Sequence, residues 1–475
     1  MAKQQDGNVT AIVLAAGQGK RMKSRMPKVL HVAGGRPLVA HVLEALRGLD
    51  LSGGRVVVSS PDVKRAVESN SWGHGVRCVA QERARGTADA VRVALEGAGL
   101  RDGVVLVTQG GSPLIRTDTF RALLETHSAQ GAVATLLTAL VPDPYGYGRI
   151  LRTESGDIEG IVEERDATEG QRSIQEINAG TYVFEVASLL DMLGRVRSDN
   201  DQGEYYLPDV LALLHSRSRR IASFHTVGME VLGVKSRTHL AEVAAVLRRR
   251  TCEQLMSEGV TIIDPHTTYI DVSVKVGRDA LIQPFTFLEG DTSVAEMAQI
   301  GPQARIVDSE IGPEATVAFS VVLGSKVGPR ASVGPFASLR PGTELKADAR
   351  IGTFVEAKQT VLGEGSKAPH LSYLGDAVIG KGVNVGAGTI TCNWDGRDKH
   401  ETVIEDEAYI GSDTMLIAPA RVGRRAATGA GAVVRGEVPD GALAVGVPAR
   451  VIEGKGDKMG AHDEAQGEAQ GEGTP

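Results

Sequence analysis

The sequence predicts a two-part α/β protein, with an N-terminal doubly wound domain followed by a C-terminal parallel β-helix of hexapeptide repeats. Three observations favour this architecture. The first half alternates short apolar runs with amphipathic stretches, and the second half repeats pairs of an aliphatic residue and a glycine. A chain of 475 residues is also too long for a single hydrophobic core.

The N-terminal half, which we delimit as residues 1–238, reads as strands and helices in alternation. Apolar runs predict strands, and apolar residues at helical spacing predict helices. We expect strands at 9–17, 55–60, 104–109 and 132–140, and helices at 37–49, 86–96 and 117–129. Such alternation is typical of a mostly parallel sheet covered by helices on both faces. One strongly periodic stretch then predicts a linker helix at 239–260.

Aliphatic-glycine pairs mark residues 261–453 as the β-helix. The pairs run from Val276-Gly277 to Val422-Gly423, and half of the spacings between them are six residues or a multiple of six. We expect each aliphatic side chain to point inward and to stack on its neighbour one coil below, with glycine at the tight corner. Spacings that break the pattern indicate loops between coils. Residues 454–475 contain almost no apolar side chains, which predicts a disordered acidic tail.

Composition limits the class of protein. The net charge of −7 argues against nucleic acid as the main partner. No apolar run approaches the length of about 18 residues that a membrane span needs, and no signal peptide is visible. The three cysteines lie far apart, so neither a disulfide framework nor a zinc site is expected. A reducing, cytoplasmic location fits this pattern.

The first candidate site is the string from Leu14 to His31. A predicted strand ends there and is followed by Gly17 and Gly19, and then by Arg21 and Lys28. Glycines let backbone N–H groups approach a triphosphate, and cations compensate its charge. Arg21 and Lys28 are therefore candidate catalytic residues for phosphate chemistry.

This string resembles the fingerprint of sugar-1-phosphate nucleotidyltransferases. The resemblance continues in the segments QERARGTADA, YGYGRI, IVEERDAT and EINAGTYVF. It implies a UDP-sugar site in which three residues read the uracil ring. The site residues implied are Leu14, Ala15, Ala16, Gly17, Lys28, Gln81, Gly86, Thr87, Gly148, Glu163 and Asn178, with Gln81, Gly86 and Thr87 at the uracil.

The second candidate site is the stretch from Gly365 to Gly396, together with GPFASLRPG at 334–342. Both resemble the acetyltransferase half of the bifunctional glucosamine-1-phosphate acetyltransferase / N-acetylglucosamine-1-phosphate uridyltransferase family, and the combined match covers about residues 9–450. The resemblance implies a left-handed coil and a homotrimer with acetyl sites between subunits. It also implies glucosamine-1-phosphate, acetyl-CoA, UTP and UDP-N-acetylglucosamine as small-molecule substrates and products.

The same resemblance assigns roles in acetyl transfer. His370 is the implied general base, because imidazole titrates near working pH. Arg340 and Lys358 would bind the sugar phosphate, and Tyr373 and Asn384 would orient the sugar. The implied acetyl-CoA groove comprises Ala387, Asn393, Trp394, Ser412 and Ala430.

Simpler readings of these residues remain open. One alternative is that His370 is simply a histidine in a surface loop. Another is that Arg340 and Lys358 are solvated charges at the edge of the coil. Tyr373 and Trp394 have the alternative of capping coil faces. The chain also departs from the family near its end, where Gly446 replaces an arginine that usually contacts the coenzyme; Arg450 is the candidate replacement.

A larger departure concerns Mg²⁺, which the family holds with an aspartate in a Gly-Asp-x-Pro-Leu motif and with a late asparagine. Here those positions are Gly111 and Lys235, and Lys20 stands where the family has a threonine. We therefore expect no metal site of the usual kind, and weak or absent uridylyl transfer. One alternative is a UDP-sugar pocket with only a regulatory or structural role, beside an enzyme that transfers acetyl groups alone. Another is a metal-independent uridyltransferase using Lys20, Arg21, Lys28 and Lys235, and a third is a structural trimer with both sites inactive.

Overall fold

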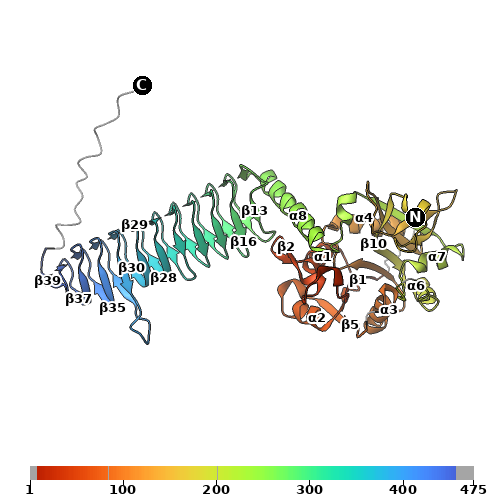
Figure 1. The fold of residues 1–475 in the computed structure, drawn as a ribbon, viewed down its shortest axis with the longest axis horizontal. Coiled ribbons are helices and arrows are strands. Elements are labelled where there is room, and N and C mark those ends of the chain that lie inside the picture. The colour runs from red at the N-terminus through yellow and green to blue at the C-terminus, as the bar shows by residue number, and fades with distance from the viewer. Residues whose placement is uncertain (1–7, 84, 201, 456–475) are drawn as a thin grey trace, which may run out of the picture. The chain divides into compact units, whose positions relative to one another are not determined.

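The computed structural model describes residues 8–83, 85–200 and 202–455. The chain divides into two compact units, and the boundary falls between Leu247 and Arg248. The first unit is a sheet covered by helices, and the second is a regular stack of short strands (Figure 1). Both parts of the predicted fold class are therefore confirmed.

The first unit is built on a twisted sheet. All neighbours along its main path are parallel except β10, which is antiparallel to both β6 and β7. The strand order is β11 (Ile221–Thr226), β7 (Ala134–Leu140), β10 (Glu176–Glu185), β6 (Val104–Gln109), β1 (Val9–Ala15), β4 (Arg55–Ser59), β5 (Val76–Ala80). Strands β8 (Arg149–Arg152) and β9 (Ile158–Val162) form an antiparallel pair attached to β10, and β2 (Val32–Ala33) pairs with β3 (Arg36–Pro37).

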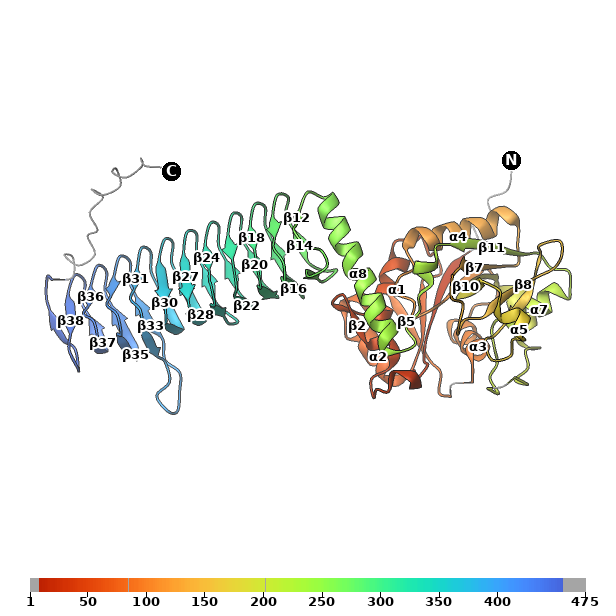
Figure 2. The same cartoon turned by 45° about the horizontal axis from the view of Figure 1, so that its top comes forward.

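Helices cover both faces of this sheet, as the alternating pattern predicts (Figure 2). On one face, α3 (Thr87–Ala98), α6 (Val186–Leu193) and α7 (Asp209–His215) share a buried apolar cluster with the strands. On the other face, the cluster includes α1 (Leu38–Arg47), α2 (Pro61–Glu68) and α4 (Thr117–Gln130). The short helix α5 (Glu169–Arg172) and the 3-10 turns η1 (Lys20–Met22), η2 (Lys28–Leu30), η3 (Ser71–Gly73) and η4 (Gly228–Val231) lie in connections.

Helix α8 (Arg237–Ser257) stands where the linker helix is predicted. Its first half buries Val243 and Leu247 in an apolar cluster of the first unit. Its second half buries Cys252 and Leu255 at the start of the β-helix core. No helix within the described residues is both long and apolar enough to cross a membrane. Nearly all of the predicted acidic tail, residues 456–475, lies outside the described residues.

The second unit is a coil with three strand faces, consistent with the left-handed coil that the resemblance implies. One face is a parallel ladder that runs through the whole unit and closes with one antiparallel strand. It comprises β12 (Thr261–Ile262), β15 (Leu281–Ile282), β18 (Gln299–Ile300), β21 (Thr316–Val317), β24 (Ser332–Val333), β27 (Arg350–Thr353), β29 (Lys367–His370), β31 (Asn384–Val385), β34 (Tyr409–Ile410), β36 (Ala427–Thr428), β38 (Leu443–Val445) and β39 (Arg450–Ile452).

The other two faces join through long strands that continue from one face to the next. Early coils have a separate strand on each face, whereas β28, β30 and β35 each pair with two strands of a neighbouring coil. These faces comprise β13 (Tyr269–Ile270), β14 (Lys275–Val276), β16 (Phe287–Glu289), β17 (Ser293–Val294), β19 (Arg305–Val307), β20 (Glu310–Ile311), β22 (Val321–Leu323), β23 (Lys326–Val327), β25 (Ser338–Leu339), β26 (Glu344–Leu345), β28 (Glu356–Leu362), β30 (Tyr373–Ile379), β32 (Ile390–Cys392), β33 (Thr402–Ile404), β35 (Met415–Val422) and β37 (Val433–Val438).

Inward stacking of aliphatic side chains is confirmed by the ladder register. Ile282, Ile300 and Val317 are consecutive partners on adjacent coils, and all three are fully buried. In most aliphatic-glycine pairs, glycine is required because the neighbouring coil leaves no room for a Cβ. A positive φ explains the glycine in fewer of the pairs. A Cβ at Gly352 would lie 2.0 Å from the Pro369 carbonyl oxygen. Many corners instead carry a non-glycine residue with positive φ, such as Arg330, so the predicted role of glycine at the corner needs this correction.

Buried His127 gives the first unit a specific acid sensitivity. Its imidazole contacts the Thr135 hydroxyl at 2.9 Å, and burial lowers its pKa from 6.5 to about 4. Because the unfolded chain binds this proton more readily, the free energy of unfolding decreases as pH falls from about 6.5 to about 4. We expect roughly 2 kcal/mol of this loss between pH 7 and pH 4.5 to be absent in His127→Gln. Urea titrations followed by Trp72 fluorescence measure it; His74→Gln, at an exposed site, should keep the loss.

Candidate functional site

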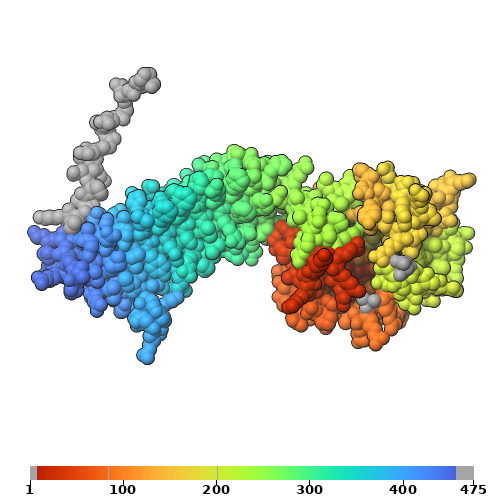
Figure 3. Space-filling model, in the orientation of Figure 1, coloured from red at the N-terminus to blue at the C-terminus, as the bar shows by residue number. Residues whose placement is uncertain are grey.

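A pocket of about 290 Å³ lies in the first unit, at the carboxyl ends of β1 and β6. Ligands of open α/β sheets bind at this edge. The space-filling view shows the first unit hollowed between its red and orange half and its yellow and green half (Figure 3). The lining residues on which our argument depends are Arg21, Lys28, Thr87, Gln109, Gly111, Ser112, Gly146, Tyr147, Gly148, Glu163, Asn178, Glu204, Tyr206 and Lys235.

Three cations line this pocket: Arg21, Lys28 and Lys235. Burial is the largest cause that lowers the pKa of Lys28, and the neighbouring Arg21 lowers it further. Burial also lowers the pKa of Lys235 to about 8, with Arg21 as the next cause. Within the described residues, neither ammonium group forms an ion pair with a carboxylate. The wall is therefore cationic and complementary to an anionic ligand.

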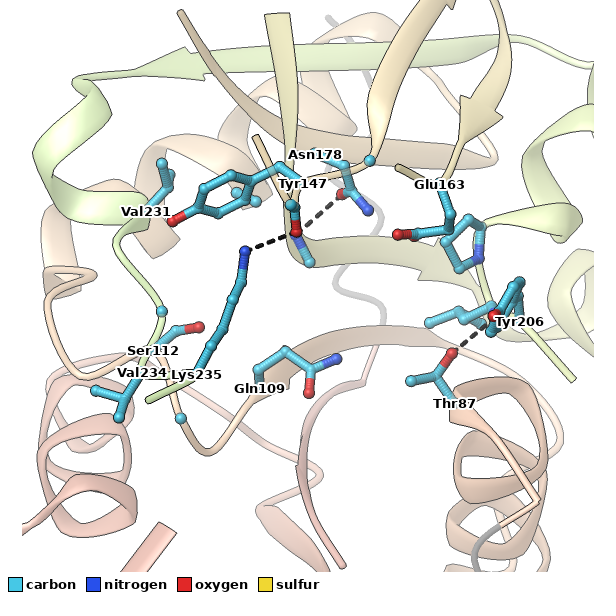
Figure 4. A pocket seen from close by; sticks show the side chains of 18 of the residues that line it. Thr87, Gln109, Ser112, Tyr147, Glu163, Asn178, Tyr206, Val231, Val234 and Lys235 are labelled. Carbon is cyan, nitrogen blue, oxygen red and sulfur yellow. Dashed lines mark hydrogen bonds between the residues drawn. The ribbon is translucent and has the colours of Figure 1, made fainter. Parts of the chain in front are cut away.

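Neutral groups hold Lys235 in place (Figure 4). Its Nζ donates a hydrogen bond to the Gly146 carbonyl oxygen at 2.8 Å, and it lies 3.3 Å from the centre of the Tyr147 ring. A cation over an aromatic face is attracted by the ring quadrupole. Both contacts fix the position of the ammonium group without compensating its charge.

The turn that receives Lys235 is itself clamped by an ion pair between buried Arg149 and partly buried Glu164. Arg149 Nη2 donates to Glu164 Oε2 at 2.7 Å, and the same oxygen accepts the Gly146 backbone N–H at 2.9 Å. The Arg149 guanidinium also donates to the Tyr147 carbonyl. Charge-assisted hydrogen bonds to one shared carboxylate oxygen restrain the backbone here, so the Gly146–Tyr147 turn is a preformed receptor for Lys235.

The facing wall carries three of the residues expected at the UDP-sugar: Gly148, Glu163 and Asn178. Glu163 is largely buried, and burial raises its pKa, whereas Lys235 lowers it. A Cβ at Gly148 would lie 2.9 Å from the Ile161 side chain and 3.2 Å from Glu163 Oε1, so only glycine fits there. Asn178 Nδ2 donates to the Tyr182 hydroxyl at 2.7 Å, across the bulge of β10.

Other predicted nucleotide residues lie outside this lining. Leu14 and Ala15 are buried in β1, and Ala16 and Gly17 follow that strand. Gln81 Nε2 donates to Asp89 Oδ2 at 2.8 Å. At Gly86, with φ of 115°, a Cβ would lie 2.4 Å from the Tyr205 carbonyl oxygen. The structure thus places Thr87, Gly148, Glu163, Asn178, Arg21 and Lys28 around one pocket and the remaining residues beside it.

The residues of this pocket do not fit Mg²⁺. The ion prefers carboxylate oxygens, phosphate oxygens and water in octahedral geometry. Gly111 supplies no side chain, and a Cβ there would lie 3.0 Å from both Cε and Nζ of Lys28. The other expected position carries the Lys235 ammonium. Across the described chain, no group of three or more His, Cys, Asp or Glu side chains has the geometry to hold a metal ion.

In the β-helix, adjacent coils bring the predicted sugar-phosphate residues together. The Arg340 backbone N–H donates to the Ala357 carbonyl, and Lys358 is the register partner of Gly375 on the next coil. Lys358 Nζ lies 3.8 Å from Asp376 Oδ2, and Arg340 pairs with Glu356 at 2.9 Å. These two cations therefore lie on successive coils of one face.

Two residues of this region were missed by the sequence reasoning. The Lys399 side chain is the largest cause that lowers the pKa of Lys358, so the two ammonium groups are close neighbours. Asp376 accepts a hydrogen bond from Asn393 and faces Lys358. Lys399 belongs to the loop between β32 and β33, which projects from the stack of coils (Figures 1 and 2). No repeat phase extends into such a loop, so no sequence signal was available.

His370 ends β29, and its side chain is exposed. The chain then rounds a corner at Leu371, which has φ of 46°, and enters β30 at Tyr373. The Tyr373 hydroxyl lies 3.5 Å from Asn393 Nδ2. Asn384 begins β31 on the coil after His370, as the partner of Lys367.

The predicted acetyl-CoA residues form two groups. One group lies on three successive coils and comprises Ala387, Ser412 and Ala430. Backbone hydrogen bonds connect these coils: the Asp413 N–H donates to the Ala387 carbonyl, and the Gly431 N–H donates to the Ser412 carbonyl. They form a column of small side chains. Asn393 is buried, while Trp394 is exposed and pairs with Lys399 at the base of the projecting loop.

Near the end of the chain, the structure shows the positions of Gly446 and Arg450. Gly446 has φ of 94° in the turn after β38. Arg450 is exposed and opens β39, where it pairs with Val445.

Several lining residues of the N-terminal pocket were missed as well. Tyr147 adjoins Gly148 in the quoted YGYGRI segment, so its neighbourhood carried a signal. Gln109 and Ser112 flank the glycines after β6, at the strand end already singled out. Glu204 and Tyr206 belong to an irregular segment without a periodic pattern, and only the folded chain brings them to the pocket.

Comparisons with known proteins agree with this geometry. A family model described as a MobA-like NTP transferase domain matches residues 11–177. A bifunctional protein GlmU from Heliobacterium modesticaldum is 48% identical over 92% of this chain and 95% of its own length. Proteins of the same name from Carboxydothermus hydrogenoformans and Thermobifida fusca are 47% and 48% identical, covering 91% and 93% of this chain and 96% and 93% of their own.

Proposed function

Because the chain belongs to the family of bifunctional GlmU proteins, we propose that it serves UDP-N-acetylglucosamine synthesis, with its β-helix transferring acetyl from acetyl-CoA to glucosamine-1-phosphate. The observation that carries this proposal is that Arg340, Lys358 and Tyr373 lie on successive coils of one face, with His370 one corner before Tyr373. These residues stand in the segments that resemble the acetyltransferase half of the family.

The chemistry proposed for His370 is general base catalysis. The sugar amine nitrogen attacks the thioester carbonyl carbon of acetyl-CoA, and the imidazole accepts a proton from that nitrogen. A C–N bond forms and the C–S bond breaks, so that coenzyme A leaves as the thiol once it regains a proton. Arg340 and Lys358 hold the phosphate through charge-assisted hydrogen bonds, which fixes the amine in position. Ala387, Asn393, Trp394, Ser412 and Ala430 supply the groove for acetyl-CoA.

Thiol release tests this proposal directly. We expect the purified chain to release coenzyme A from acetyl-CoA when glucosamine-1-phosphate is present. Glucose-1-phosphate, which has the phosphate but lacks the amine, should release none. Equal release with both sugars, or release with neither, would contradict acetyl transfer.

We propose that three copies of the chain assemble, with the acetyl sites between them. A ladder of apolar side chains on successive coils supports this proposal. Phe319, Phe336 and Phe354 follow one another with ring centroids 5.6 Å apart, and Phe336 and Phe354 are 55% and 59% exposed. Exposed apolar ladders of this kind mark interaction surfaces, and a second copy offers an identical surface.

Substitution of this ladder is expected to break the assembly. Phe336→Ser with Phe354→Ser removes two large apolar side chains from the proposed interface, whereas Val378→Ser changes an exposed apolar residue elsewhere on the coil. Light scattering should give three times the chain mass of 50.0 kDa for the unmodified protein and for the Val378 variant. The double variant should approach one chain mass and lose most acetyl transfer. An unmodified protein of one chain mass would contradict the trimer.

For the first unit, we propose a pocket that binds UTP or UDP-N-acetylglucosamine but performs uridylyl transfer weakly. Family membership supports the activity itself, and Arg21, Lys28, Thr87, Gly148, Glu163 and Asn178 remain in the pocket. The lack of Mg²⁺ ligands at Gly111 and Lys235 is what weakens it. The same observation favours a second candidate, an acetyltransferase with a UDP-sugar-binding domain of regulatory or structural role. Pyrophosphate release from UTP separates the two, because the second candidate produces none.

We further propose a cytoplasmic location. Cys78, Cys252 and Cys392 are all free thiols. Such thiols persist in a reducing compartment.

A further inference from the structure

We propose that the N-terminal pocket binds a nucleoside diphosphate sugar without any divalent cation, with the Lys235 ammonium as the fixed positive charge that meets the diphosphate. This inference deepens the proposed function of the same pocket and rests on it. It follows from the disagreement between the pocket's side chains and a metal site.

The pocket wall that would meet the diphosphate is positively charged. Arg21, Lys28 and Lys235 converge on one cavity, and within the described residues neither lysine forms an ion pair; the Glu163 carboxylate acts on Lys235 only from the facing wall. Holding ammonium groups without an ion-pair partner in a partly buried position costs free energy. A diphosphate supplies the missing negative charge, so its binding relieves that cost.

The Lys235 side chain is held in position before a ligand binds. A surface lysine is a flexible point charge and loses rotamer freedom when it binds. Lys235 is already held by the Gly146 carbonyl and the Tyr147 ring, on a turn clamped by Arg149 and Glu164. Much of the ordering cost is therefore met before the ligand arrives.

A lysine side chain occupies the space that a metal ligand would need. The Cβ position of Gly111 is 3.0 Å from Lys28 Nζ, so Lys28 approaches the backbone where a carboxylate would otherwise project. One expected ligand position, Gly111, thus faces the Lys28 ammonium, and the other carries the Lys235 ammonium. One cation comes from the loop after β1, and the other comes from the segment before α8.

A single ammonium differs from a divalent ion in what it does for the reaction. It binds and neutralises one phosphate oxygen region, but it does not template several oxygens or act as a strong Lewis acid. The pocket is therefore suited to retain a nucleotide sugar more than to turn it over. Metal-independent binding and weak uridylyl transfer have the same physical origin.

Calorimetric titration of the full chain with UDP-N-acetylglucosamine tests the inference. We expect the Kd measured with EDTA to agree within about twofold with the Kd measured with Mg²⁺. Lys235→Met keeps the length and apolar stem but removes the charge, and should weaken binding at least tenfold in both buffers, as expected for a charge-assisted contact. Lys64→Met, a matched change at an exposed lysine on α2, should leave Kd unchanged.

Uridine serves as the neutral probe. If Lys235 acts through the phosphates, Lys235→Met should leave uridine binding unchanged while it weakens the nucleotide sugar. Equal weakening of both ligands would show a structural effect and overturn the inference. Binding that requires Mg²⁺ would also overturn it, although the proposed nucleotide pocket would stand. Failure of the nucleotide sugar to bind in either buffer would instead contradict the proposed function of the pocket.

Discussion

His370→Ala is expected to reduce kcat/KM for acetyl transfer to glucosamine-1-phosphate by about 10²–10⁴-fold, the usual contribution of a positioned general base. The substituted chain should fold normally, because His370 is exposed and its side chain fills no part of the buried core. Coenzyme A thiol release over time is the measurement. The loss should appear mainly in kcat, since Arg340 and Lys358 still hold the sugar phosphate.

Two comparisons make the His370 result specific. His266→Ala changes another exposed histidine of the same unit and should leave acetyl transfer intact. Binding of UDP-N-acetylglucosamine to the first unit should be identical in the unmodified chain and the His370 variant. If His370→Ala kept more than a tenth of the unmodified rate, the assignment of the general base would be wrong.

The second large effect is expected from restoring side-chain metal ligands. Gly111→Asp combined with Lys235→Asn replaces one missing carboxylate and removes one ammonium from the same pocket. Uridylyl transfer in Mg²⁺ should rise at least tenfold, because Lewis-acid stabilisation of phosphoryl charge is worth several kcal/mol. Pyrophosphate release from UTP and N-acetylglucosamine-1-phosphate measures it, and EDTA should abolish the gain.

The structure indicates that the site tolerates this change. Gly111 does not adopt a left-handed φ, and the nearest atoms to an added Cβ are the flexible end of Lys28 at 3.0 Å and the Val234 carbonyl oxygen at 3.8 Å. Gly111→Asp alone should help less, because the new carboxylate faces both Lys28 and Lys235. Gly111→Asn with Lys235→Asn is the matched control without a carboxylate, and it should not gain the metal-dependent rate. A double Asp/Asn variant no faster than the unmodified chain would refute the explanation.

Most of the fold could be predicted from the repeating pattern of apolar residues in the sequence. Aliphatic-glycine pairs predicted the inward columns that include Ile282, Ile300 and Val317, since burial imposes the same residue type on every coil. The antiparallel strand β10 was not predicted, because a buried central strand has the same apolar composition in either direction. Strands such as β28 that continue around a corner also leave no distinct pattern, since their apolar spacing is that of the separate strands.

The site was predictable only where motifs are contiguous. The resemblance singled out Gly111 and Lys235, and the fold places both in one pocket. The resemblance did not indicate which residues hold the Lys235 ammonium in position. Tyr147 and the Arg149–Glu164 pair act through a turn whose geometry depends on tertiary contacts. Lys399 was missed for the same reason, because its approach to Lys358 depends on how a projecting loop folds back.

The most direct test of the central claim, that acetyl transfer is active while the nucleotide pocket lacks its metal ligands, is to measure both half-reactions on one preparation of the unmodified chain. Thiol release and pyrophosphate release are followed separately, each with Mg²⁺ and with EDTA. We predict rapid thiol release that EDTA does not change, and pyrophosphate release that is slow in both buffers. Pyrophosphate release that matches the rate of thiol release in Mg²⁺ and stops in EDTA would contradict the account.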